Sequence, residues 1–301
     1  MGVLENILAC AAYLGDVDAE ERTQIFERLF KERVNIKRES IMRTYKDMGE
    51  DWNQTLYTLL LKYLGSTHNG EAMEQLSRVV SYNMIAKERG ALLNIEALLL
   101  GGAGLLDLYT EDSYIRALKE EFIHLQAKYN ITPLSAEVWR LHYIYPNTHP
   151  TLRLVQFAAS VHQQALSFDT ATECRTRKDV HKILSGAASE YWLEHFAFGS
   201  NATASAHIGA FTKDLLGINV IIPILVANGV FMENSELISR ALNLAKNIPA
   251  EDNRYIKMWQ NPAAPIAISA IDSQAMLHLH RTYCENNLCK ACLIWVKRRG
   301  L

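Results

Sequence analysis

Three cysteines near the end of the chain form the most specific chemical pattern in this sequence. Cys284, Cys289 and Cys292 are spaced Cys-x4-Cys-x2-Cys, so one turn could bring three sulfur atoms around a single centre. Thiolates are the preferred ligands of zinc and of iron–sulfur clusters. His280 lies one helical turn before Cys284 and would complete a site of three cysteines and one histidine. The spacing therefore indicates a metal site at Cys284, Cys289, Cys292 and His280.

Alternatives to this metal site stay open at this stage. The fourth ligand could also be Cys10, Cys174 or another histidine. A plant-type two-iron cluster would need a fourth cysteine further along, where only nine residues remain, so zinc is favoured over iron–sulfur. Three reduced cysteines could instead pack a C-terminal hairpin without any metal. The odd total of five cysteines fits a reducing compartment better than a disulfide framework.

Four ionisable residues are candidates for catalysis. Glu96 is a lone carboxylate in an apolar stretch, so it must find hydrogen-bond partners or stay protonated. His195 follows Tyr191 by four residues, and on one helix face the phenol could position the imidazole for proton transfer. Arg153 lies near the start of an expected helix, where it could hold a carboxylate or a phosphate. With Asp272, these residues would line the polar cleft of an enzyme.

Each of these candidates also has a structural interpretation, which we favour. A buried carboxylate such as Glu96 is more often hydrogen-bonded to helix ends than used as a catalytic acid. A histidine among aromatic residues, such as His195, is more often part of their packing. For Arg153 we expect a structural ion pair with Glu96, Asp107 or Asp272.

A buried helix over about residues 91–106 is the element expected to organise the chain. This stretch is apolar on every face except at Asn94 and Glu96, and it is too short and too polar to cross a bilayer. The sequence Gly101-Gly-Ala-Gly104 ends it, so these glycines indicate close packing and helix termination rather than a phosphate-binding loop. No segment alternates with a period of two, so no sheet is expected.

Residues that begin and end helices predict the other main elements. Gly65 should end one helix, Pro150 and Asn234 should begin two others, and Gly217 with Pro223 should kink an apolar one. The sequence Thr110-Glu-Asp-Ser113 is expected to cap a further helix. We therefore expect an all-α fold, either a multi-helix bundle or an irregular helical array. Its main helices should cover residues 3–14, 18–45, 52–64, 91–106, 114–129, 150–166, 205–228, 235–245 and 269–283.

The polar stretch Ser167–Lys178 is the expected boundary between two parts of the chain. It would divide an N-terminal helical half, residues 1–167, from a C-terminal half with the cysteine-rich end, residues 168–301, although the chain could also form one continuous domain. The opening residues lack the basic region of a signal peptide, so we expect a cytoplasmic protein without a membrane partner.

The charge balance limits the classes of partner. The net charge of −2 argues against a protein dominated by nucleic-acid or anionic-membrane binding. The segment Lys31–Lys46 is nevertheless locally basic, which more often marks a solvated helix face than a nucleic-acid stripe. If nucleic acid does bind, we expect one continuous basic face that is built from Lys37, Arg38, Arg43, Arg175 and Arg177.

Six segments in a fixed order resemble a known bacterial family, domain of unknown function 2851. The resemblance extends over nearly all of the chain and includes the three C-terminal cysteines. The segments are Asp51-Trp-Asn-Gln-Thr-Leu-Tyr57, Asn94-Ile-Glu-Ala-Leu-Leu-Leu-Gly-Gly-Ala-Gly-Leu105, Pro150-Thr-Leu-Arg-Leu-Val-Gln-Phe157, Tyr191-Trp-Leu-Glu-His195, Asp272-Ser-Gln-Ala-Met-Leu277 and the Tyr283–Cys292 stretch.

The resemblance implies a helical fold and leaves the activity open. Members of the family are longer and begin with a segment that suggests a nuclease-like sheet, so this chain corresponds to their helical remainder. The family has Arg-Pro-x-Asn-Phe-Pro where this chain has Tyr145-Pro-Asn-Thr-His-Pro150, and His280 is not one of its characteristic positions. Our first hypothesis is a non-catalytic domain that binds a protein partner or supports a nuclease-like segment. The alternative is an enzyme or nucleic-acid-processing factor with a cleft around Glu96, Arg153 and His195.

Overall fold

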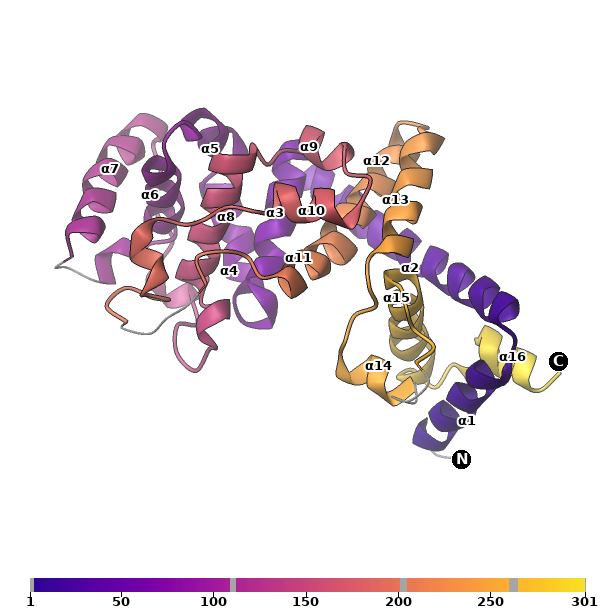
Figure 1. Cartoon of the computed structure of the whole chain (residues 1–301). Helices are drawn as coiled ribbons and strands as arrows, with labels where there is room; N and C mark the ends of the chain where they lie inside the picture. Colours follow the sequence, from indigo (N-terminus) through magenta and orange to yellow (C-terminus); the bar gives the residue numbers. More distant parts are fainter. Residues whose placement is uncertain (1–2, 109–111, 201–204, 260–264, 301) are drawn as a thin grey trace. The chain divides into compact units, whose positions relative to one another are not determined.

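The fold is all-helical, as predicted. The computed structural model describes residues 3–108, 112–200, 205–259 and 265–300. In these residues the backbone forms no β-strand, and the only β-type pairing is an isolated antiparallel bridge between Pro249 and Ser269. The chain divides into two compact units, one formed by residues 1–42 with 225–301 and the other by residues 43–224 (Figure 1). Their boundaries fall within helices α2 (Ala19–Asp47) and α12 (Ile222–Phe231).

The boundary suggested at residue 167 lies inside the unit formed by residues 43–224. The polar residues that suggested it begin two short helices. Ser167 forms a capping box with Thr170 at the start of α9 (Phe168–Thr172). Thr176 forms a second capping box with Asp179 at the start of α10 (Arg177–Ile183). The polarity of this stretch is therefore explained by satisfied helix ends.

Helix α6 (Leu92–Gly102) is the enclosed central helix of its unit. Every residue from Ile95 to Gly102 is buried, and α6 packs against both α7 (Ser113–Tyr129) and α8 (Pro150–Gln164) (Figure 1). The helix ends a turn earlier than expected, because Gly104 adopts a left-handed conformation with φ of +68°. A side chain there would also collide with the carbonyl oxygen of Leu134.

Several helix boundaries in this unit follow from local chemistry. Helix α3 (Trp52–Leu64) ends at Gly65, and Pro150 occupies the first turn of α8, as predicted. Thr110 and Glu111 of the expected cap lie outside the described residues, and Asp112 accepts the N–H of Tyr114 instead. The remaining helices are α4 (Ser66–Val79), α5 (Tyr82–Glu88), α11 (Ala210–Leu216) and the 3-10 turns Leu106–Leu108, Ala136–Val138, Pro146–Thr148 and Glu190–Leu193.

The predicted kink in the apolar helix is a π-helical turn at Gly217–Ile221, which joins α11 to α12. The segment Ala210–Phe231 is long and apolar enough to cross a membrane by length and composition. Most of it is buried within the structure, and a core helix passes the same test, so the segment is weak evidence for a membrane span.

The unit formed by residues 1–42 and 225–301 combines the two ends of the chain. Asn234 accepts the N–H of Leu237 and so begins α13, as predicted. The expected helix over residues 269–283 is α15 followed by a π-helical turn that ends at Cys284. The helices of this unit, besides parts of α2 and α12, are α1 (Val3–Asp16), α13 (Ser235–Asn247), α14 (Arg254–Trp259), α15 (Ala270–His278) and α16 (Leu293–Arg298).

Candidate functional site

Glu96 is fully buried on α6 and is held by residues from two other elements. The hydroxyl groups of Tyr114 and Ser189 both donate to Oε2, at 2.7 and 2.6 Å, and the backbone N–H of Ser189 donates to Oε1 at 3.3 Å. Burial raises the pKa of Glu96, although these three hydrogen bonds lower it in part. The carboxyl group thus fastens α7 and the Ser189 loop to the central helix.

A stack of aromatic rings extends from this carboxyl group, beginning at Tyr114. The indole Nε1 of Trp192 donates to the Tyr114 hydroxyl at 2.9 Å, so that hydroxyl receives one hydrogen bond and donates another to Glu96. Tyr114 stacks on Tyr191 with centroids 4.9 Å apart, and Tyr191 stacks on His195 at 4.0 Å. These residues form one packed polar network of the kind that fixes a core arrangement.

His195 lies at the outer end of this stack. Its Nδ1 is 2.8 Å from the backbone oxygen of Tyr191, and the Tyr191 hydroxyl accepts the backbone N–H of Gly199 at 3.1 Å. The contact between Tyr191 and His195 is therefore a ring stack combined with a backbone hydrogen bond. The expected arrangement, in which the phenol orients the imidazole, does not describe these contacts.

Arg153 lies on α8 and is 7% exposed. Its Nη1 donates to Gln156 at 3.0 Å and its Nη2 to Thr212 at 3.2 Å, while Nε has no hydrogen-bond partner among the described residues. The expected ion pair with Glu96, Asp107 or Asp272 is wrong, because the described contacts of Arg153 are to neutral side chains. Burial lowers the pKa of Arg153 to about 10. An otherwise unpaired buried guanidinium is costly, which makes Arg153 the least satisfied of the catalytic candidates.

Asp272 is in the unit formed by residues 1–42 and 225–301, whereas Glu96, Arg153 and His195 are in the other unit. It occupies the first turn of α15, where its Oδ2 accepts the backbone N–H groups of Ile268 and Ser269 at 2.9 Å each. Ser269 and Asp272 form a capping box. The role that the structure gives to this carboxylate is therefore to begin a helix.

His149 is a buried residue whose importance the sequence did not reveal. Its Nδ1 lies 2.7 Å from the hydroxyl of Thr151, which in turn donates to the backbone oxygen of Phe196 at 3.0 Å. The imidazole packs edge-on against the Phe196 ring. Because His149 immediately precedes α8, these contacts fix the start of that helix.

We predict that protonation of His149 destabilises the protein in mild acid. Burial lowers its pKa to about 4, below the usual 6.5, so the stabilising contribution is present above pH 6.5 and is lost as pH falls towards 4. The free energy of unfolding should drop by about 1–2 kcal/mol between pH 7 and pH 5 through this residue. Urea denaturation at both pH values would measure the drop, which His149→Gln should remove and the exposed His124→Gln should retain. An unchanged drop in His149→Gln would contradict the assignment.

A second polar cluster joins α10 to α11, and the sequence did not predict it because its members are far apart in the chain. Arg177 binds both carboxylate oxygens of Asp214 at 2.7 Å, and His181 Nε2 lies 2.8 Å from Asp214 Oδ1. Burial raises the pKa of Asp214, but the hydrogen bonds from Arg177 and His181 lower it by more. Arg177 is thus engaged in a bidentate ion pair.

Lys213 and Ser185 lie beside this cluster and have the residue types of a serine–lysine dyad. Lys213 Nζ donates to Ser185 Oγ at 2.6 Å, and Ser185 Oγ donates to the backbone oxygen of His181. A lysine that activates a serine must instead accept the hydroxyl proton. These contacts place Ser185 and Lys213 at the C-terminal end of α10, where the Ser185 hydroxyl caps a backbone carbonyl group.

The predicted metal ligands lie in the unit formed by residues 1–42 and 225–301. His280 Nε2 is 3.4 Å from Glu285 Oε1, its ring lies against Tyr255, and its Nδ1 is buried with no hydrogen-bond partner among the described residues. In the part of the chain that the structure describes, no group of three or more histidine, cysteine, aspartate or glutamate side chains is placed to hold a metal ion. The set Cys284, Cys289, Cys292 and His280 therefore stays a prediction.

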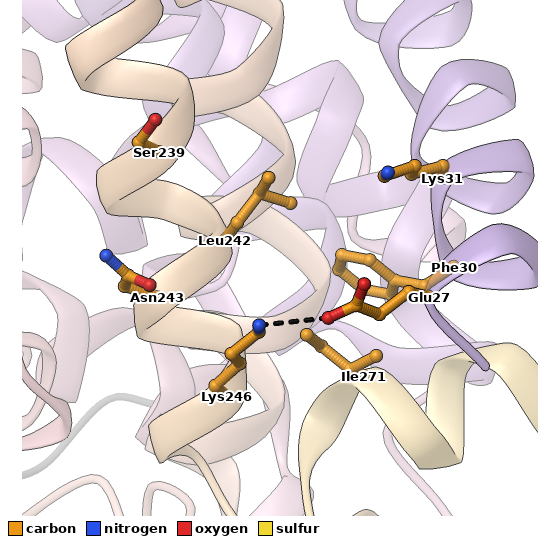
Figure 2. A pocket seen from close by; sticks show the side chains of 8 residues that line it. All are labelled: Glu27, Phe30, Lys31, Ser239, Leu242, Asn243, Lys246 and Ile271. Carbon is orange, nitrogen blue, oxygen red and sulfur yellow. Dashed lines mark ion pairs between the residues drawn. The ribbon is translucent and has the colours of Figure 1, made fainter. Parts of the chain in front are cut away.

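A small surface pocket opens between α2 and α13, with Ile271 of α15 on its wall (Figure 2). Figure 2 shows Glu27 and Lys246 pointing towards each other from the two helices, and their ion pair measures 2.9 Å. The pocket has a volume of about 220 Å³, below the range of about 300–1,000 Å³ that is usual for small-molecule sites. It contains none of the catalytic candidates. Its other lining residues are Phe30, Lys31, Ser239, Leu242 and Asn243.

Comparison with known proteins identifies a family for the chain. No curated protein and no solved structure matches the chain. A family described as "Protein of unknown function (DUF2851)" matches residues 3–254, which is most of the chain and agrees with the resemblance seen in its motifs. The chain belongs to this family of unknown function.

Proposed function

We propose that this chain is a non-catalytic helical scaffold that binds a protein partner. The observation that carries the proposal is the position of Glu96, which is fully buried and accepts three hydrogen bonds from Tyr114 and Ser189. A catalytic acid must reach its substrate within hydrogen-bond distance. Glu96 is instead used to hold three elements of the core together.

The other catalytic candidates support the same conclusion. His195 is held by a ring stack and by the backbone of Tyr191, and Asp272 begins a helix in the other unit. An active site requires its acid, base and binding groups to converge on one point. The described contacts of these residues serve separate structural purposes.

An exposed aromatic loop offers a surface for the partner. Tyr143 and Tyr145 are 97% and 84% exposed, and they lie two residues apart between two 3-10 turns. Tyr143 also has a φ of +60°, a conformation that costs a residue with a bulky side chain about 1–2 kcal/mol. Tyrosine is enriched among the residues that dominate the energy of protein interfaces. A strained loop that presents two tyrosines to solvent is suited to such an interface.

The partner that we propose is the nuclease-like segment that the family resemblance implies. A helical scaffold of this kind would hold that segment in place, and a reducing, cytoplasmic location would suit its five free cysteines. In such a scaffold the buried polar residues, such as Glu96, form hydrogen bonds that hold the helical core together.

Isothermal titration of the full chain with that segment, produced separately from a longer relative, tests the proposal. We expect binding at micromolar or tighter affinity, and the double variant Tyr143→Ser/Tyr145→Ser should weaken it by about tenfold or more. Ile123→Ser removes a similarly exposed apolar side chain from α7 and is the matched control, with no expected effect.

Two results would contradict the scaffold. One is the absence of binding, or binding that the tyrosine variant leaves unchanged. The other is catalysis by the chain alone, for example metal-dependent cleavage of nucleic acid that Arg153→Lys abolishes while the protein stays folded. Arg153 is the residue to change, because a buried guanidinium whose described partners are neutral is the feature that most favours the alternative function.

A further inference from the structure

Arg153 carries a positive charge that no described residue neutralises. Its side chain on α8 is 7% exposed, and its two described partners, Gln156 and Thr212, are neutral. Among the residues that the structure describes, this guanidinium forms no ion pair with a carboxylate. Burying a charge without a counterion is costly, and buried arginines are normally paired with an acid. A single negative charge beside Arg153 would remove this cost.

The guanidinium also has hydrogen-bond donors that the described residues do not use. Arginine carries five N–H groups. One on Nη1 donates to Gln156 and one on Nη2 donates to Thr212, at 3.0 and 3.2 Å. The other three, which include the buried N–H of Nε, have no described partner. Charged donors of this kind bind carboxylates strongly and can contact both of their oxygen atoms.

Neighbouring groups hold this guanidinium in place. Gln156 is buried, and its Nε2 donates to the backbone oxygens of Ser205 and His207 at 2.7 and 3.0 Å. Both N–H groups of this amide are therefore used, and Oε1 is left to face Arg153. The Thr212 hydroxyl accepts a hydrogen bond from Arg153, and its own proton has no described acceptor. The hydroxyl can therefore donate to a ligand that the guanidinium binds.

The start of α11 gives a ligand access to this site. Thr212, which contacts the guanidinium, is half-buried in the first turn of that helix. Gly209, which precedes the helix, is exposed, and a Cβ at this position would meet no described atom within 4 Å. A small molecule can approach Arg153 from this side. A carboxylate on the surface of a folded protein reaches such a deeply buried side chain less readily, so a free ligand is favoured.

From the unneutralised charge and the three available N–H groups, we propose that Arg153 and Thr212 bind a small free monocarboxylate and that Gln156 positions the guanidinium. A monoanion balances the single positive charge, whereas a dianionic phosphate would leave one negative charge in excess. The carboxylate oxygens accept hydrogen bonds from the guanidinium and from the Thr212 hydroxyl, and no covalent bond forms. The ligand therefore strengthens the link that Arg153 makes between α8 and α11.

Thermal unfolding of the full chain in sodium acetate, and in sodium chloride of equal ionic strength, tests the site. A ligand that binds only the folded state stabilises that state by mass action. At about 100 mM acetate and a dissociation constant of about 1 mM, the ratio of folded to unfolded protein should rise about a hundredfold above its value in chloride. The midpoint should then rise by about 5 °C or more. Acetamide has a similar size without the charge and should have no such effect.

Three substitutions locate the acetate effect at this site. Arg153→Gln should abolish it, because the new amide can still donate to Gln156 but carries no charge. Thr212→Val should weaken acetate binding by about fivefold, as expected for one lost hydrogen bond, and Thr212→Ser should restore it. Arg116→Gln is the matched control, because this arginine is exposed on α7 in the same unit, and it should keep the full response.

A measurement on the wild-type chain makes the test independent of these variants. With ¹⁵N-labelled arginine, one Nε–H signal should shift when acetate is added and should saturate at the dissociation constant found by unfolding. The absence of any such shift would overturn the proposal, as would equal midpoints in acetate and chloride or an acetate effect that Arg153→Gln retains. Stronger stabilisation by phosphate would contradict the choice of a monocarboxylate. The proposal does not rest on the scaffold function, because none of these measurements involves the partner.

Discussion

Replacing Glu96 with alanine is expected to lower the free energy of unfolding by about 2–4 kcal/mol. The substitution removes the acceptor for the hydroxyl groups of Tyr114 and Ser189 and leaves a small cavity beside α6. Both hydroxyls then lose a buried hydrogen bond, and the ring network that depends on Tyr114 loses its anchor. Urea denaturation followed by tryptophan fluorescence would measure the change, because Trp192 lies in this network.

Glu96→Gln is the matched variant, because it keeps the volume and one acceptor oxygen. Burial raises the pKa of Glu96 above its ordinary value of 4.5, so its contribution is fully present below pH 4.5 and is lost as pH rises through the folded-state pKa. We therefore expect the free energy of unfolding of Glu96→Gln to stay within about 1 kcal/mol of the wild-type value. The variant should also lose the pH dependence of stability that comes from Glu96. Equal destabilisation by Gln and Ala, with no change in pH dependence, would contradict the structural role of this carboxyl group.

Features set by neighbouring residues could be predicted from the sequence. The central helix near residue 96, its termination by glycine, the cap at Asn234 and the distortion at Gly217 all follow from residue types within one or two turns. Helix periodicity and capping act over short distances, so an isolated sequence contains them. The absence of a strand among the described residues follows from the same patterns.

Features that depend on distant residues could not be predicted in this way. Ser189 is 93 residues from Glu96, and Asp214 is 37 residues from Arg177. The apolar sequence around Glu96 shows that its carboxylate needs hydrogen-bond partners, but it does not identify the residues that provide them. For this reason the sequence indicated that Glu96 is structural and gave the wrong partner to Arg153.

Replacing Gly101 with alanine is expected to lower the free energy of unfolding by about 2–3 kcal/mol, although the new group is a single methyl. A Cβ at this position would lie 2.2 Å from Cγ of Phe122 and 2.3–2.5 Å from both Cδ atoms of that ring. The ring is buried between α6 and α7, so it cannot move without disturbing the packing of the two helices. Chemical denaturation would measure the loss.

Gly90→Ala is the matched control, because a Cβ there meets no described atom within 4 Å and the residue is exposed. It should leave the free energy of unfolding unchanged or raise it by a few tenths of a kcal/mol. Alanine lowers the conformational entropy of the unfolded chain, which stabilises the folded state wherever the backbone conformation permits alanine. In the double variant Gly101→Ala/Phe122→Leu the smaller side chain makes room for the methyl group. The two substitutions should therefore be markedly non-additive, because they act on one contact. Additive losses in the free energy of unfolding would show that the collision with Phe122 does not cause the destabilisation. They would also show that the close approach of α7 to α6 does not depend on Gly101.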